Sequence, residues 1–173
     1  SRRGAEIREV LKRAVEIIVR SQNRQGGWRY HPQPRDADMS VTVMQIVALS
    51  SASEAGILVP DSVIQKAIGY VTSCQHESSG GFGYQGPRDP GFARTAAGVT
   101  SLLMCGDRAS GRVRRGLDYL RKTRAETFRS DKWFYYGHFY AAQAMYQAGQ
   151  SHYQEWYPHV REALIVRQRK DGS

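Results

Sequence analysis

Apolar residues recur at helical spacing along most of the chain. In the first such segment, residues 4–21, one face carries Ile7, Leu11, Val15, Ile18 and Val19. The same spacing predicts further helices over 40–55, 62–74, 92–105, 110–123, 134–148 and 152–168. No run of any length shows the strict apolar and polar alternation that is typical of a half-buried strand. We therefore predict an all-α protein with about seven helices.

The predicted helices are of two kinds. Segments 40–55, 92–105 and 134–148 are poor in charge all round, whereas the other four are amphipathic and rich in Arg and Glu. A helix without a polar face is buried on all sides, and an amphipathic helix has water on one side. Alternation of the two kinds predicts two layers, an inner ring of helices wrapped by an outer ring. This arrangement is an α/α toroid.

The sequence also repeats internally. An offset of 53 residues takes Ala14 to Ala67, Thr42 to Thr95 and Leu49 to Leu102. Each copy has a Gln, a short polar loop, a Gly pair and an aromatic residue. Gln168 opens another copy, and a degenerate copy at 117–133 has Arg124 in place of the Gln. We predict one repeat domain over 1–173, with repeats at about 1–39, 40–91, 92–133 and 134–173.

The repeated residues suit a structural role. A Gln side chain can bond backbone groups at the ends of adjacent helices. A Gly pair allows positive φ and close approach to a neighbouring helix, and an aromatic ring fills the gap between outer helices. The residues that we assign to this role are Gln22, Gly27, Trp28, Gln75, Gly81, Phe82, Trp133 and Gln168.

These repeats resemble those of a known superfamily. Residues 22–28, Gln-x-x-Gln-Gly-Gly-Trp, are similar to the QW motif of squalene–hopene and oxidosqualene cyclases, and 75–82 and 168–173 look like variants of it. Residues 38–49 and 135–149 resemble inner helices of bacterial prenyltransferase/squalene-oxidase repeat proteins. The resemblance covers essentially the whole chain. It implies the terpenoid cyclase/protein prenyltransferase toroid and an isoprenoid-type pocket.

The resemblance also suggests candidate catalytic carboxylates. Squalene–hopene cyclases carry a D-x-D-D motif, and the nearest match is Asp36-Ala37-Asp38-Met39, in which Met39 replaces the last Asp. Asp38 falls at the position of the acid, with Asp36 as the other candidate. Without the neighbouring carboxylate we favour a different reading, in which Asp38 caps the following helix and Asp36 is solvated. Catalytic activity is therefore in doubt.

A toroid would place its pocket along the axis, between the inner helices and the loops before them. The candidate pocket-lining residues are Thr42, Gln45, Arg94, Tyr136, His138 and Tyr140, with Arg88 and Asp89 on the preceding loop. Aromatic walls suit carbocation chemistry through cation–π attraction. They suit a well-packed inner helix equally, and we favour packing.

Charge and cysteine content add little to this picture. The net charge is +9, from 25 basic and 16 acidic residues. Much of the positive charge falls on amphipathic helices, where solvated Arg is ordinary, so we do not expect nucleic-acid binding. Cys74 and Cys105 are expected to be unpaired, and the compact set Cys74, His76 and Glu77 does not indicate a zinc site. We predict no cofactor, no metal and no transmembrane segment, and the sequence indicates no compartment.

Two further classes of function stay open beside the isoprenoid reading. One is a non-catalytic toroid that binds a protein, peptide or glycan. The other is an (α/α) carbohydrate-active enzyme using Asp36 or Asp38 with a distant carboxylate. Because a closed double ring needs about six helix pairs, we expect this chain to be part of a longer protein or to self-associate through open ring edges.

Overall fold

The structure is a computed structural model that describes residues 2–130 and 132–172. These residues form seven α-helices and no β-strand, which confirms the all-α prediction. The helices are α1 (Arg2–Arg20), α2 (Met39–Glu54), α3 (Asp61–Ser73), α4 (Phe92–Met104), α5 (Gly111–Ser130), α6 (Phe134–Ala148) and α7 (Gln150–Arg167). Among the described residues, no helix is both long and apolar enough to cross a membrane.

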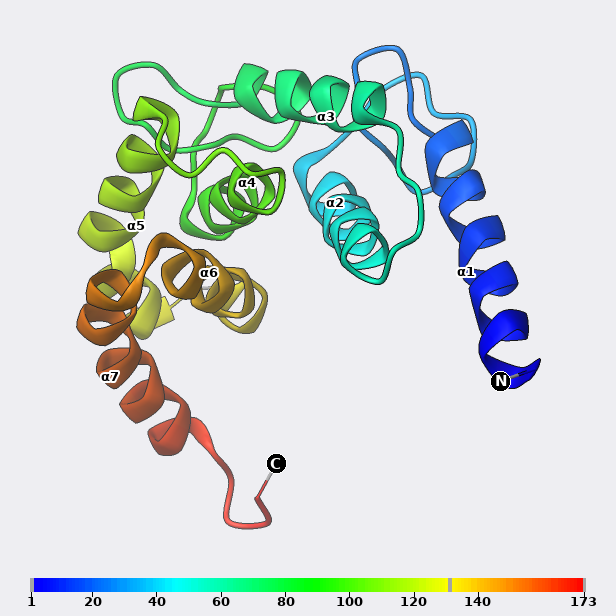
Figure 1. The fold of residues 1–173 in the computed structure, drawn as a ribbon. Helices are drawn as coiled ribbons and strands as arrows, with labels where there is room; N and C mark the ends of the chain where they lie inside the picture. The colour runs from blue at the N-terminus through cyan, green and yellow to red at the C-terminus, as the bar shows by residue number, and fades with distance from the viewer. Residues whose placement is uncertain (1, 131, 173) are drawn as a thin grey trace.

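The helices form two layers along an open arc. Helices α2, α4 and α6 lie on the inside of the arc, and α1, α3, α5 and α7 lie along its outside (Figure 1). In the inner layer α4 packs between α2 and α6. The charge-poor segments are therefore the inner helices and the amphipathic segments are the outer ones, as the composition predicted. Closure of the arc into a toroid stays a prediction.

Burial of the inner helices is uneven. Eleven of the 13 residues of α4 are buried, because α4 has neighbours on every side. The flanking inner helices each leave one side open: Met44 on α2 is 57% exposed, and Tyr135 and Phe139 on α6 are 66% and 62% exposed. The expectation that all three charge-poor helices are buried on all sides is therefore wrong for α2 and α6.

The repeated Gln residues join successive outer helices. Nε2 of Gln22, just after α1, donates to the carbonyl oxygens of Gly26 and of Val63 in α3, both at 2.9 Å. Nε2 of Gln75, after α3, donates in the same way to Gly80 and to Arg112 in α5. Each Gln thus closes its own loop and ties that loop to the first turn of the next outer helix.

The two other predicted members of this series differ. Gln168 keeps the bond within its own loop, from Nε2 to the carbonyl of Gly172 at 2.9 Å. Arg124, in the degenerate copy, donates from Nη1 to the carbonyl of Glu155 in α7 at 3.4 Å. A guanidinium therefore replaces the Gln amide as the link between two outer helices.

The Gly pairs allow the loops to press against the next outer helix. Gly26 and Gly80 have φ of +93° and +76°, and a Cβ on either would lie within 3 Å of backbone atoms of Lys66 or Arg115. A Cβ on Gly27 or Gly81 would be equally close to neighbouring side chains. Both parts of the expected role, positive φ and close approach, are present.

Trp28 and Phe82 pack inside the wall of the arc. Trp28 is 2% exposed and its indole Nε1 donates to the carbonyl of Ile18 at 2.7 Å, while Phe82 is fully buried. The backbone N–H of each aromatic donates to a Thr hydroxyl of the following inner helix, Thr42 at 3.2 Å or Thr95 at 2.9 Å. These contacts support the packing role.

Trp133 does not share that role, and the prediction for it is wrong. It is 58% exposed and stands immediately before α6, the position that Asp38 and Gly91 hold before α2 and α4. The reason is that α5 runs on to Ser130, seven residues beyond the predicted end, so the Gly-pair loop is missing here. Phe128, stacked on His138, fills the space between α5 and α6 instead.

Candidate functional site

A large groove lies where the three inner helices begin. Its volume is about 630 Å³, and its walls come from the first two turns of α2, the first turn of α4, the start of α6 and the two Gly-pair loops. The lining residues are Tyr30, Met39, Ser40, Val41, Met44, Tyr84, Ala93, Arg94, Trp133 and Tyr136. Most of these side chains are aromatic or aliphatic, as is typical of pockets that bind apolar small molecules.

Arg94 and Tyr136 lie in the groove, in agreement with the predicted pocket. Nη1 of Arg94 donates to the carbonyl of Asp89 at 2.6 Å, which holds the guanidinium at the groove wall. Arg94 and Tyr84 also line a second cavity of about 370 Å³, formed with the loop at residues 85–89. Arg88 and Asp89 belong to this second cavity and not to the main groove.

Four predicted pocket residues are absent from the lining of this groove. Thr42 is fully buried, because its hydroxyl accepts the N–H of Trp28. Gln45 is half-buried farther along α2. Tyr140 is 6% exposed and packs edge to face against Tyr136. Thr42 is turned to the loop before α2, and Gln45 and Tyr140 lie farther along their helices than the lining residues Met44 and Tyr136.

His138, the fourth, lies within an aromatic cluster. Its ring is 4.5 Å from the Phe134 ring and stacks at 5.3 Å on Phe128, centroid to centroid. Its Nε2 is 2.9 Å from the hydroxyl of Thr127, and the residue is 4% exposed. These partners come from α5 and α6, so His138 packs the two helices together and does not face the groove.

The sequence analysis did not predict several of the residues that line the groove, but the repeat pattern could have indicated two of them. Tyr30 and Tyr84 each stand two residues after the repeated aromatic, at the end of the Gly-Gly-aromatic-x-Tyr run. Because the repeat places both loops at the same end of the inner helices, the two tyrosines come together, with their hydroxyl oxygens 3.3 Å apart. Met44 and Trp133 carry no such signal.

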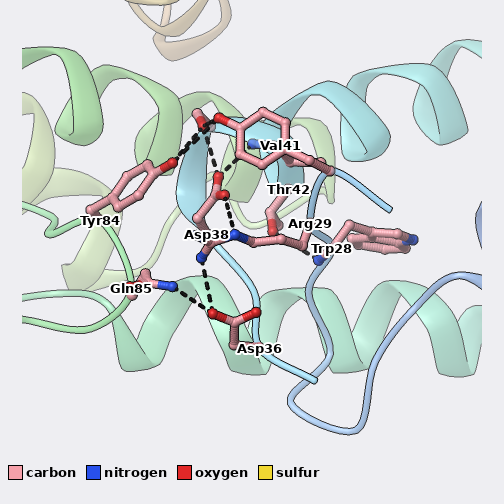
Figure 2. A network of polar contacts seen from close by, with 10 residues as sticks. Trp28, Arg29, Asp36, Asp38, Val41, Thr42, Tyr84 and Gln85 are labelled. Carbon is pink, nitrogen blue, oxygen red and sulfur yellow. Dashed lines mark hydrogen bonds and ion pairs between the residues drawn. The ribbon is translucent and has the colours of Figure 1, made fainter. Parts of the chain in front are cut away.

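Asp38 is a buried helix cap. Its Oδ1 accepts the backbone N–H of Val41 at 2.9 Å and the hydroxyl of Ser40 at 2.7 Å, and its Oδ2 lies 3.3 Å from Nε of Arg29 (Figure 2). The side chain is fully buried and does not line the groove. The predicted cap is therefore present through Oδ1, whereas the buried Oδ2 has the ion pair with Arg29 but no hydrogen-bond partner among the described residues.

Asp36 lies apart from Asp38 on the other side of Arg29. Its Oδ2 is 3.1 Å from Nη1 of Arg29 and accepts a hydrogen bond from Nε2 of Gln85 at 3.0 Å (Figure 2). The side chain is 55% exposed. Arg29 thus separates the two carboxylates, and Asp36 is solvated as expected for a non-catalytic residue.

Other candidate chemistry in the sequence is not assembled into a site. Cys74 is buried and Cys105 half-buried, and both are free thiols, as expected. Burial raises the pKa of each thiol, to about 12 for Cys105, where the Asp107 carboxylate adds to the effect. Within the described residues, no three His, Cys, Asp or Glu side chains converge as metal ligands would.

Comparisons with protein families, with curated proteins and with solved structures find no match for this chain. The similarity to QW-repeat proteins therefore stays a resemblance carried by the repeat residues.

Proposed function

We propose that the chain is a terpenoid cyclase/prenyltransferase-like repeat domain whose groove binds an isoprenoid-type apolar ligand. The observation that carries the proposal is the groove of about 630 Å³ at the start of the inner helices, with its aromatic and aliphatic walls. Its volume lies within the range of roughly 300–1,000 Å³ that is typical of small-molecule pockets.

The groove walls suit a long, branched hydrocarbon. Met39 and Met44 offer flexible thioether chains that adapt to an irregular apolar surface. Tyr136 and Trp133 add aromatic faces, which bury a large apolar area with little loss of side-chain entropy. The polar lining is confined to a few groups, which favours an apolar chain over a glycan.

Binding is proposed here without proton-donating catalysis. A cyclase-type acid must reach the ligand, yet Asp38 is fully buried outside the groove lining and is engaged by Val41, Ser40 and Arg29. Asp36 is solvated beyond Arg29. These contacts favour a binding module over a squalene cyclase-like enzyme, and they give no support to a glycosidase reading.

The test is a titration with the sesquiterpene hydrocarbon farnesene, followed by tryptophan fluorescence. Trp133 lines the groove and is exposed, whereas Trp28 and Trp156 are both 2% exposed, so ligand binding is expected to change chiefly the Trp133 signal. Met44→Arg puts a charge on the apolar wall at an already exposed position and is expected to weaken binding about tenfold or more.

Leu58→Arg is the matched control, because Leu58 is 87% exposed and lies outside the groove. It is expected to leave the affinity for farnesene unchanged. A titration in which farnesene does not bind, or binds equally well to wild type and Met44→Arg, would contradict the proposal. Capture of a peptide or glycan in the same groove, with no farnesene binding, would favour the alternative binding module.

A further inference from the structure

Three hydroxyl groups meet at the polar side of the groove. Ser40, the second residue of α2, has its Oγ 3.2 Å from the Tyr30 hydroxyl and 3.5 Å from that of Tyr84, and the two phenol oxygens are 3.3 Å apart. All three residues line the groove. We call this set the hydroxyl cluster (Ser40, Tyr30 and Tyr84).

The direction of the hydrogen bonds follows from Asp38. The shortest contact of Ser40 is to the carboxylate oxygen Oδ1 of Asp38, at 2.7 Å, and a carboxylate can only accept. The single proton of Ser40 therefore points at Asp38. The Ser40 oxygen is left as an acceptor for the Tyr30 hydroxyl.

The remaining protons are used inside the cluster. In the 3.5 Å contact between Ser40 and Tyr84, Ser40 would be the donor, and its proton is already on Asp38. Tyr30 therefore donates to Ser40, and Tyr84 donates to Tyr30. Three protons then satisfy the three links from Tyr84 to Asp38. The hydroxyl cluster consequently presents only lone pairs to the groove, and the buried negative charge at its end strengthens each link by polarisation.

We propose that the hydroxyl cluster selects, among the apolar ligands of the groove, those that end in a hydrogen-bond donor, an isoprenoid-type alcohol being the chemistry that fits. This inference rests on the proposed function, since it concerns the polar end of the same ligand. An alcohol can donate its proton to an oxygen of the cluster. An ether or a carbonyl has no proton to donate, so its lone pairs are repelled by those of the cluster.

Two neighbouring groups bear on this selectivity. Burial raises the pKa of Tyr84 to about 12 and that of Tyr136 further, so the phenols near the groove stay neutral at physiological pH. Arg94, Tyr136 and Trp133 also line the groove and carry N–H or O–H groups that can donate to an acceptor ligand, although Nη1 of Arg94 is bonded to Asp89. A test must therefore separate the cluster from these three residues, which substitution of the cluster residues does.

The experiment compares farnesol with farnesyl methyl ether and with farnesene, by the Trp133 titration. Wild type is expected to bind farnesol about fivefold more tightly than the ether, the factor provided by one hydrogen bond of ordinary net strength. In Tyr30→Phe/Ser40→Ala/Tyr84→Phe, which removes all three acceptor oxygens, this preference is expected to fall toward onefold, while the affinity for farnesene is retained. The extra methyl group of the ether acts in both proteins, so its bulk cancels in the comparison.

Ser40→Ala is the second variant, because it keeps both phenols and removes their link to Asp38. A phenol proton is then free to point into the groove, so the affinity for the ether is expected to rise toward that for farnesol. Equal affinities of wild type for the alcohol and the ether would overturn the inference, as would a preference that persists in the triple variant. Failure of farnesene to bind would contradict the proposed function instead, so the two failures are distinguishable.

Discussion

Trp28 is the repeat residue whose contacts most clearly indicate that it stabilises the fold. Its ring is buried and its Nε1 donates to Ile18 at the end of α1. Trp28→Ala removes a large buried side chain and is expected to lower the free energy of unfolding by about 3–5 kcal/mol. Urea unfolding followed by circular dichroism measures this change.

Trp133→Ala is the matched control, since Trp133 is the same residue type at an exposed position. It is expected to change the stability by no more than about 0.5 kcal/mol. Equal losses in the two variants would show that Trp28 has no special packing role.

The thiols give a prediction that depends on pH. Burial raises the pKa of the Cys105 thiol to about 12, so at pH 8 far less of it is thiolate than in the unfolded chain. We expect iodoacetamide to modify Cys105 at least about 100-fold more slowly in the native protein than in urea, as measured by mass spectrometry. Because the folded pKa is the higher one, this group supports stability below about pH 8.5 and that support declines as pH rises.

A Cys74→Ser variant makes the assignment to Cys105 direct. Modification of native Cys105 at the rate of the unfolded chain would refute the effect of burial on its pKa.

At the residue scale, the sequence correctly predicted roles that depend on neighbouring residues in the chain. It was less successful for roles that depend on where a side chain points in the folded protein. The cap at Asp38 follows from its place before an apolar helix, and it is present. The orientation of Thr42 and His138 depends on which loop or helix meets each residue, and helical periodicity of one chain does not contain that information. Both were therefore misplaced in the pocket.

At the scale of elements, the close contact between each Gly-pair loop and the next outer helix can be tested by comparing alanine substitutions at three glycines. Gly26, Gly80 and Gly106 all have positive φ. A Cβ at Gly26 or Gly80 would also collide with Lys66 or Arg115, whereas a Cβ at Gly106 meets nothing within 4 Å. Alanine at Gly106 is expected to cost about 1–2 kcal/mol, the conformational penalty alone.

Gly26→Ala and Gly80→Ala are expected to cost more than Gly106→Ala by at least about 1 kcal/mol each, since backbone must move to relieve the overlap. Urea unfolding of the three variants measures the difference. If all three substitutions cost the same, the close approach of loop and outer helix contributes nothing to stability.

Helix existence was predictable at this scale, but the length of one helix was not. All seven expected helices are present, because each has an apolar face or an apolar surround at helical spacing. Apolar spacing predicted a helix over 110–123, so the expected end of α5 was 123. Arg124, Ala125 and Glu126 favour helix over loop, so α5 continues, and Trp133 moves to the start of α6.

At the scale of the whole molecule, the composition predicted the order of the layers, whereas most of the side chains that line the groove could not be predicted. Charge-poor and amphipathic segments alternate along the chain. This alternation correctly predicted which helices lie on the inside of the arc in Figure 1. The groove depends on how the first turns of α2, α4 and α6 and two loops converge. Repeats indicate that these parts are equivalent, but not which side chains reach the shared space.

The same arrangement predicts a gradient of stability across the arc. Helix α4 is buried between α2, α5 and α6, whereas in α1 only Val15 is buried among residues 3–20. Opening α4 requires separation of the inner layer, while opening α1 exposes little new apolar surface. We expect amides of α1 to exchange with solvent deuterium at least about 100-fold faster than those of α4, with the outer helix α3 between them.

Hydrogen exchange followed by mass spectrometry at two protein concentrations measures this gradient. The order α1, α3, α4 is expected at both concentrations if the arc stays a single copy. Equally slow exchange of α1 and α4 at both concentrations would contradict the gradient. Protection of α1 that rises with concentration would instead mean that its exposed residues Ile7, Val10 and Ile17 are covered by a second copy, which is the self-association through open edges expected from the repeats.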